Sequence, residues 1–257
     1  TMKIVGIIPA RFNSTRFPGK VLSLLDNRPL IWHVYNAAAE SGILDAVCVA
    51  ADHEAVQKAC AEYNIPCLIT GTWHPNPTSR IWEAAGQVEA DFYVMMGADE
   101  PMISPGDIRQ VVHQAVKAMS ETSGLPESDR PFVVNAMASI TSAPEVFDSA
   151  NIKIVCSQAG KCLYASRSPV PYPKGSLDYS YKKFVSIGVY TKEALDFFAA
   201  SPISRLEKIE EFDLLRFIEQ GKNVIFEDIS GSTLSVDTPK DLERIREQFE
   251  DRKRNEK

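Results

Sequence analysis

The 257-residue chain is poor in the side chains that build disulfide frameworks and zinc sites. It has five cysteines, an odd number with no C-x-x-C pair, and four histidines without the close spacing of a metal-binding motif. We therefore expect no disulfide framework and no zinc site, and we expect reduced, mostly buried thiols.

Three other features are missing. No apolar run approaches the ~20 residues that a membrane span needs, and residues 1–10 form no signal-peptide core. A net charge of −6 argues against a general nucleic-acid binder, because phosphate-backbone affinity rests on excess Lys and Arg. No G-x-G-x-x-G follows the first expected strand, which disfavours a nicotinamide oxidoreductase. We expect a cytoplasmic protein that binds neither membranes nor nucleic acids.

What is present is an alternation of strand and helix patterns. Ala46–Ala51 and Asp91–Met96 read as buried strands, and Pro29–Ser41, Glu54–Tyr63 and Ser79–Val88 read as helices. Ser104 is expected to cap a further helix, and a capping box at Ser204 is expected to open another that ends at Gly221. This order predicts an α/β fold with a mostly parallel central sheet flanked by helices. We expect one domain over residues 1–257, with an inserted β-rich lobe at about 133–190.

The opening segment has the layout of an anion clamp. Residues 4–8 supply the apolar, β-branched run of a strand, and residues 9–20 then bring Arg11, Arg16 and Lys20 with no acid among them. A loop after the first strand lies at the carboxyl edge of an α/β sheet, where ligands bind. Backbone N–H groups beside Arg and Lys suit a polyphosphate, although a solvated basic loop is the alternative.

Two aspartates share one setting between a strand and a proline-marked helix start. Asp99 stands in Ala-Asp-Glu-Pro, and Asp237 stands in Val-Asp-Thr-Pro. If the sheet brings them together, they suit Mg²⁺, which binds one or two carboxylates and substrate phosphate oxygens. Alone, each is as readily a turn or cap residue.

At this point the motifs resemble those of one family, the CMP-Kdo synthetases (3-deoxy-manno-octulosonate cytidylyltransferases). The resemblance spans nearly the whole chain, and its motifs are the Pro-Ala-Arg to Pro-Gly-Lys opening at 7–20, Asp-Glu-Pro-Met at 99–102, the Asn-x-Lys strand at 151–155, Leu-Tyr-x-Ser-Arg at 163–167 and the Val-Asp-Thr-Pro-x-Asp-Leu segment at 236–242.

The resemblance implies a nucleotidyltransferase fold and transfer of CMP from CTP to a 3-deoxy-octulosonate sugar acid for lipopolysaccharide synthesis, with release of pyrophosphate. It also implies Mg²⁺ as cofactor and a homodimer. It implies catalytic roles for Arg16, Lys20, Asp99 and Asp237, with the two aspartates as the Mg²⁺ ligands. It implies nucleotide-binding roles for Pro9, Ala10, Arg11, Ser14, Thr15, Arg16, Lys20, Thr78 and Arg80. It implies sugar-binding roles for Arg167, Ser186 and Asp213.

The chain departs from the family pattern where the sugar is held. Gly97 stands for the family's Gln, Ser186 for its His, and Asp213-Leu214 for Glu-Gln; Pro77 also stands for a Gly in the base-contacting segment. These changes motivate the hypothesis of a variant substrate, 8-amino-3,8-dideoxy-manno-octulosonate, with the acids at 210, 211 and 213 facing its ammonium group. Solvated helix residues are the plain alternative for Glu210 and Glu211, and an interface salt bridge is the alternative for Arg167.

Other functions remain open on sequence alone. Ordinary Kdo is one alternative substrate. A nucleotide-sugar glycosyltransferase also places acids at a strand end, and a catalytically inactive nucleotide-binding module would keep the loop without the chemistry. Retention of both Asp99 and Asp237 argues against the inactive module.

Overall fold

The computed structural model describes residues 2–231 and 233–255 and has an α/β architecture built on a nine-stranded sheet. The strands are β1 Ile4–Ala10, β2 Leu24–Leu25, β3 Arg28–Pro29, β4 Ala46–Ala51, β5 Cys67–Ile69, β6 Phe92–Met96, β7 Val133–Ser139, β8 Lys153–Cys156, β9 Cys162–Ser166, β10 Lys182–Tyr190 and β11 Val224–Ile229. The helices are α1 Leu30–Glu40, α2 Glu54–Glu62, α3 Pro77–Ala85, α4 Pro105–Glu121, α5 Ala143–Phe147, α6 Lys192–Ala200, α7 Arg205–Glu210, α8 Leu215–Glu219 and α9 Pro239–Asn255, with 3-10 turns η1 Lys20–Leu22 and η2 Glu127–Asp129.

The sheet is parallel on one side and mixed on the other. Its main path runs β11-β7-β10-β6-β1-β4-β5, and the pairs β6-β1, β1-β4, β4-β5 and β11-β7 are parallel. Strand β10 is antiparallel to both β6 and β7. The fold prediction of a mostly parallel sheet flanked by helices is therefore confirmed.

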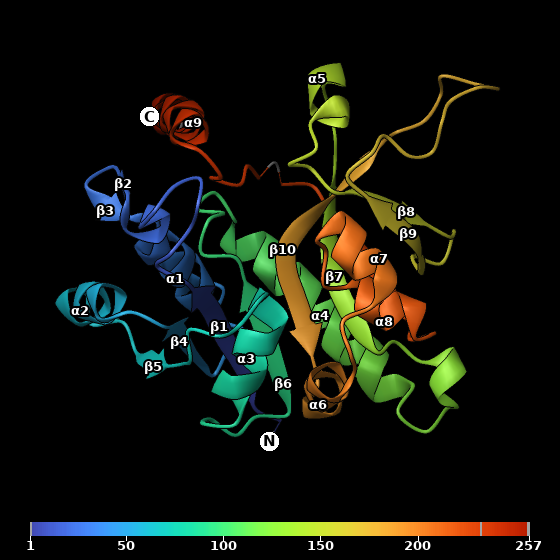
Figure 1. The fold of residues 1–257 in the computed structure, drawn as a ribbon, viewed down its shortest axis with the longest axis horizontal. Coiled ribbons are helices and arrows are strands. Elements are labelled where there is room, and N and C mark those ends of the chain that lie inside the picture. Colours follow the sequence, from blue (N-terminus) through green and yellow to red (C-terminus); the bar gives the residue numbers. More distant parts are fainter. Residues whose placement is uncertain (1, 232, 256–257) are drawn as a thin grey trace.

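Helices cover both faces of the sheet (Figure 1). Residues of α1 and α4 pack with β1, β4 and β6 in one apolar core, whereas residues of α3, α6 and α8 pack in a second core on the opposite face. Because the strands are buried on both faces, they read as continuous apolar runs, which explains why they were recognisable in the sequence.

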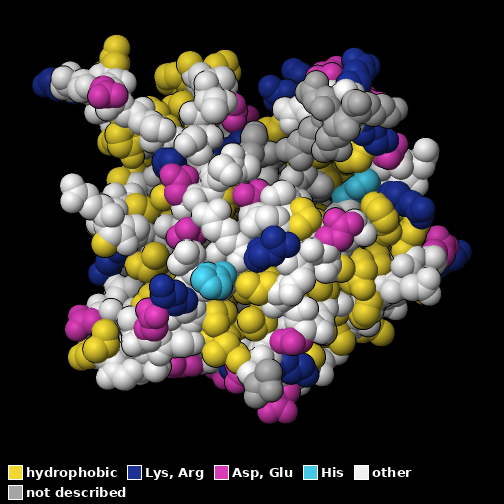
Figure 2. Space-filling view, turned by 180° about the vertical axis from the view of Figure 1, so that it is seen from behind, with side chains coloured by type: hydrophobic (Ala, Val, Ile, Leu, Met, Phe, Trp, Pro, Cys, Tyr) yellow, Lys and Arg dark blue, Asp and Glu magenta, His cyan; other side chains and the backbone are white. Residues whose placement is uncertain are grey.

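The stretch predicted as a β-rich lobe is divided in the structure. Strands β7 and β10 belong to the main sheet path, whereas β8 and β9 pair with each other and join it through β10. The connection between β9 and β10 extends away from the body of the protein in Figure 1. On the opposite face of the molecule, Figure 2 shows acidic and basic side chains intermingled with apolar ones.

One sequence prediction was wrong: the helix expected from the Ser204 capping box to Gly221 is two helices. The capping box is present, but α7 ends at Glu210, where Glu211 adopts a left-handed conformation with φ of 50°, and α8 begins only at Leu215. The carbonyls of Glu210 and Glu211 accept hydrogen bonds from Arg167, which stabilise this ending. The interruption places Asp213 in a turn.

A second prediction needs a smaller correction. The helix expected over Ser79–Val88 begins earlier, because Asn76 caps α3 by accepting a hydrogen bond from Ser79 N, and Pro77 occupies the first helical turn. Proline is favoured there because its missing N–H has no intrahelical partner. Among the described residues, no helix is long and apolar enough to cross a membrane.

Candidate active site

The basic loop after β1 lies at the carboxyl edge of the sheet and is closed by its own backbone. Gly19, at φ of 67°, donates its N–H to Phe12 O at 2.9 Å. Phe12 N in turn donates to Asp52 Oδ1 at 3.1 Å, which ties the loop to the end of β4. The loop therefore has a defined path beside the ends of β1, β4 and β6.

Asp99 and Asp237 come together because their backbone segments are hydrogen-bonded. Val236 N donates to Asp99 O at 2.8 Å. Val236 is fully buried in a small third apolar core between α9 and the segments around β2 and β3. Asp241 secures the start of α9 by accepting hydrogen bonds from the backbone N–H groups of residues 237 and 238. The segment that follows β6 and the segment that precedes α9 therefore lie side by side, and they bring Asp99 and Asp237 together.

Lys20 lies between the two carboxylates. Its Nζ is 2.6 Å from Asp99 Oδ2 and 3.4 Å from Asp237 Oδ1. Burial by itself lowers the pKa of Lys20, but the charges and hydrogen bonds of Asp99 and Asp237 outweigh it, and the pKa stands above its ordinary value. Lys20 is therefore a fixed positive charge held between the two carboxylates.

The other loop residues lie around this centre. Arg16 donates to Asp237 Oδ1 at 3.1 Å with 63% of its side chain exposed, and Arg11 and Thr15 are exposed as well. Ser14 Oγ accepts from Phe17 N at 3.4 Å. Pro9 and Ala10 form the end of β1. Arg11 and Arg16 are thus both accessible to solvent beside the two aspartates.

The residues expected to contact the base are buried on α3. The Arg80 guanidinium donates to Asp52 Oδ2 at 2.8 Å, to Thr70 Oγ1 at 2.7 Å and to Gly71 O at 3.1 Å. Burial lowers the pKa of Arg80, an effect that Asp52 opposes. Thr78 is fully buried and bonded to Asp213. Arg80 therefore serves first to hold the segments that surround this side of the site.

Ser186 lies opposite the start of the Asp99 loop. Its O accepts from Gly97 N at 3.0 Å, and its N donates to Glu100 Oε1 at 2.9 Å. Glu100 is buried, and its Oε2 has no hydrogen-bond partner among the described side chains and backbone. Burial, reinforced by the charge of Asp99, raises the pKa of Glu100 to about 7.

Arg167 is engaged mainly with backbone carbonyls. Its guanidinium donates to the carbonyls of Glu210 at 2.6 Å, Ser149 at 2.9 Å and Glu211 at 3.1 Å. Two of its five N–H groups, one on each terminal nitrogen, have no partner among the described residues. The Glu210 carboxylate accepts from Arg167 N and also from the hydroxyls of Tyr164 and Ser166. Glu210 is therefore committed to holding the 164–167 segment.

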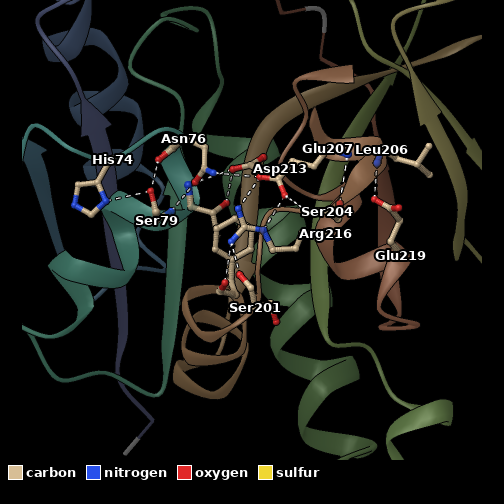
Figure 3. Close-up of polar contacts among 12 residues, drawn as sticks. His74, Asn76, Ser79, Ser201, Ser204, Leu206, Glu207, Asp213, Arg216 and Glu219 are labelled. Atoms are coloured by element: carbon tan, nitrogen blue, oxygen red, sulfur yellow. Dashed lines mark hydrogen bonds and ion pairs between the residues drawn. The ribbon is translucent and has the colours of Figure 1, made fainter. Parts of the chain in front are cut away.

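Asp213 bridges two sides of the site. Its Oδ2 accepts from Thr78 Oγ1 at 2.7 Å and from Thr78 N at 3.3 Å. Burial raises the pKa of Asp213, and the hydrogen bonds from Thr78 partly offset the rise. Figure 3 shows Asp213 between the start of α3, at Asn76 and Ser79, and the Glu207–Arg216 ion pair.

Sequence reasoning missed Asp52, Glu100 and Glu207 as residues that shape the site. Asp52 joins the basic loop to Arg80, and it directly follows β4. The strand-end rule that identified Asp99 applies equally to Asp52, so a signal for it was present. Glu207 pairs with Arg216 at 2.7 Å, and only its place in the capping box was visible in the sequence.

Comparison with known proteins gives one consistent answer. The family model described as Cytidylyltransferase matches residues 5–229. The chain is 33% identical over 99% of its length to a 3-deoxy-manno-octulosonate cytidylyltransferase of Acidobacterium capsulatum, 99% of which is covered. It is also 33% identical over 95% of its length to one of Escherichia coli, of which 95% is covered.

A solved structure of CMP:2-keto-3-deoxy-manno-octonic acid synthetase complexed with CTP superposes with a TM-score of 0.86 at 32% identity, covering 97% of this chain and 99% of that one. A putative glucose-1-phosphate thymidylyltransferase of Bacillus anthracis shares the fold alone, with 15% identity and a TM-score of 0.67. The chain belongs to the cytidylyltransferase family.

Proposed function

We propose that this protein transfers CMP from CTP to the anomeric hydroxyl of a 3-deoxy-octulosonate sugar acid in the cytoplasm and releases pyrophosphate, a step toward lipopolysaccharide. The carrying observation is the convergence of the basic loop with Asp99 and Asp237 around Lys20. Relatives that match nearly the whole chain bear the name of this activity.

The chain's own residues carry out the positioning. Lys20 and Arg16 neutralise the triphosphate, and Arg11 with the N–H groups of the loop and the hydroxyls of Ser14 and Thr15 orients it. The end of β1, at 9–10, and the start of α3, with Thr78 and Arg80, enclose the nucleoside. An in-line displacement needs no covalent protein nucleophile, so catalysis rests on alignment and charge neutralisation.

The acids at the centre fit a Mg²⁺ ion. Two carboxylates from separate segments already hold a cation, Lys20 Nζ, between them. Among the described residues, no group of three or more His, Cys, Asp or Glu side chains forms a metal site. Mg²⁺ suits a pair of carboxylates because substrate phosphates and waters supply its other ligands. Bound there by Asp99 and Asp237, it would neutralise the charge that develops on the α-phosphate.

For the sugar acid, we propose contacts from Arg167, Ser186 and Asp213. The two unpartnered N–H groups of Arg167 suit a carboxylate. Because Glu210 is bonded to three donors, the proposed preference for the 8-amino sugar rests on Asp213, whose Oδ1 accepts no hydrogen bond from the described residues.

The decisive experiment mixes the purified protein with CTP, MgCl₂ and a panel of sugar acids and measures pyrophosphate and product mass. We expect release with octulosonates and a higher kcat/KM for the 8-amino sugar than for ordinary Kdo. The variant Asp213→Asn should narrow that ratio. Equal or better turnover of Kdo would remove the amino-sugar preference. No release with any octulosonate would indicate an inactive nucleotide-binding module, and transfer only from an already activated sugar would indicate a glycosyltransferase.

We also propose that the protein acts as a homodimer. Exposed apolar side chains on α5 and on the β9–β10 connection support a contact with a second copy: Phe147 is 76% exposed, Tyr172 is 84% exposed and Leu177 is 87% exposed. Sedimentation analysis should give twice the 28.5 kDa chain mass. A monomer at the concentrations used for assay would contradict this.

A further inference from the structure

Strand β10 carries a bulge where it presents Ser186. In its pairing with β7, Val185 lies opposite Ala136, and the next paired residue is Gly188, opposite Asn135. Ser186 and Ile187 therefore have no counterpart in β7. Bulges of this kind re-aim side chains and occur frequently beside active sites. A bulge also leaves backbone groups outside the regular ladder, and those groups need other partners when they are buried.

Asn135 bonds the residue that directly precedes the bulge from the β7 side. It is fully buried, and its Nδ2 donates to Val185 O at 2.8 Å and to Ala136 O at 2.9 Å. A Cβ on Gly188 would lie only 2.7 Å from Asn135 Oδ1, so a glycine is required for the amide to lie there. The side chain thus bridges the two strands where their regular pairing is broken.

Glu100 and Gly97 hold the same bulge from the β6 side. Glu100 Oε1 accepts from Ser186 N at 2.9 Å, and Gly97 N donates to Ser186 O at 3.0 Å. Both backbone polar groups of Ser186 are therefore bonded to the loop that carries Asp99. The bulge has no freedom to shift toward or away from that loop without breaking a buried hydrogen bond.

The consequence is a fixed position for the Ser186 side chain. A Cβ on Gly97 would lie 2.8 Å from both Cβ and Oγ of Ser186 and 3.1 Å from Asp99 Oδ1. The serine therefore lies against Gly97 beside Asp99, and there is no room for a side chain at position 97. Residues 97 and 186 form one complementary pair in the wall of the site.

We propose that Asn135 and Glu100 are positioning residues that lock the β10 bulge, and that they thereby set the shape of the sugar-acid pocket next to Asp99. The effect on catalysis rests on the proposed function, whereas the locking of the bulge does not. Neither side chain needs to touch substrate. Losing either lock lets Ser186 move, and small displacements of positioning groups have large effects on rate.

The test compares Asn135→Ala with Asn223→Ala. Asn223 is a matched control because it is also buried, donates its Nδ2 to two carbonyls, those of Ser128 and Arg130, and has an Oδ1 with no partner among the described residues. It lies just before β11, and its side chain bonds the segment that precedes β7 rather than the bulge. Both variants lose similar packing contacts, but only Asn135 lies beside the bulge.

We expect Asn135→Ala to raise the KM for the sugar acid about tenfold while leaving the KM for CTP unchanged. Asn223→Ala should lower the melting temperature and leave both KM values unchanged. Glu100→Gln keeps an oxygen acceptor and should retain the wild-type KM for the sugar acid, whereas Glu100→Ala should raise it. The comparison of Glu100→Gln with Glu100→Ala still tests the proposal if Asn135→Ala folds poorly.

Amide hydrogen exchange of residues 184–188, measured without substrate, tests the lock itself. Exchange should accelerate about tenfold in Asn135→Ala and not in Asn223→Ala. Unchanged exchange and an unchanged KM for the sugar acid would overturn the inference. If wild-type protein releases no pyrophosphate, the proposed function fails, and the exchange result still decides whether Asn135 locks the bulge.

Discussion

Two groups of charged side chains in this protein have similar composition and opposite character. The edge cluster, Arg16, Lys20, Asp99 and Asp237, has side chains between 12% and 63% exposed. The bracing cluster, Glu207 and Arg216, has side chains 7% and 6% exposed. Arg216 is bonded to both oxygens of Glu207 and to the carbonyls of Phe198 and Ser201, and it stacks on the Phe198 ring at 3.7 Å.

The difference shows which charges are available for chemistry. In the bracing cluster nearly every donor has a protein acceptor, so the charges hold α7 and α8 against α6. In the edge cluster the side chains are more exposed, so its charges remain available to the triphosphate and metal ion proposed above.

The largest effect is expected from Lys20→Met. Removal of the charge between Asp99 and Asp237 should lower kcat/KM for CTP about 10³-fold with little loss of stability, because transition-state charge loses its partner. Pyrophosphate release measures this. Lys222→Met is the matched control, since the Lys222 side chain is 13% exposed and pairs with Glu127 away from the edge cluster. Wild-type activity in Lys20→Met would contradict the assignment.

Breaking the bracing cluster should act on stability. Arg216→Met leaves the Glu207 carboxylate buried without its partner, and we expect a loss of about 3–5 kcal/mol in the free energy of unfolding. Urea denaturation followed by circular dichroism measures it. The double variant Glu207→Gln, Arg216→Met should recover part of the loss. A full loss of activity in folded Arg216→Met, at wild-type stability, would show that the contrast between the clusters is wrong.

Arg167 shares features of the edge cluster and of the bracing cluster. Arg167→Gln removes the guanidinium that bonds three carbonyls, and we expect a loss of about 2 kcal/mol in stability. If its two remaining N–H groups bind the sugar carboxylate, the KM for the sugar acid should also rise while the KM for CTP stays the same. Destabilisation without any change in the KM for the sugar acid would assign Arg167 to bracing alone.

The smallest effect is a pH dependence at Asp213. Burial raises its pKa in the folded state, so its ionisation becomes unfavourable to folding as pH rises above the ordinary value for Asp of about 3.9. Asp213→Asn cannot ionise and can still accept from Thr78. Its stability relative to wild type should therefore increase in thermal melts as pH rises above about 3.9, the ordinary pKa of Asp. A difference in stability between Asp213→Asn and wild type that does not change with pH would contradict the raised pKa of Asp213.

Much of the fold was predictable because local signals agreed with the tertiary structure. The strand Ala46–Ala51 and the cap at Ser104 appear where the sequence places them. The strand-end rule accounts for Asp99, which follows β6, whereas Asp237 lies well beyond the end of β11 and reaches Asp99 through the backbone hydrogen bond from Val236 N to Asp99 O. Local sequence was sufficient where a run was long and apolar or where a cap was distinct.

The remainder depended on contacts between distant segments. The break between α7 and α8 is stabilised by Arg167, 43 and 44 residues away from the carbonyls that it bonds. A lone Asn in an apolar strand gave no sign that Asn135 bonds Val185 across the bulge, 50 residues away. Such residues look like ordinary polar exceptions until the pairing of β7 with β10 is known.

The most direct test of the account is a double-mutant cycle on the two aspartates, read as Mg²⁺-dependent pyrophosphate release from CTP. Asp99→Asn and Asp237→Asn should each lower kcat/KM about 10²-fold or more. Because the two carboxylates act as one unit, the kcat/KM of the double variant should be only slightly below that of the less active single variant. Losses that multiply, or wild-type release from either single variant, would contradict a shared site around Lys20.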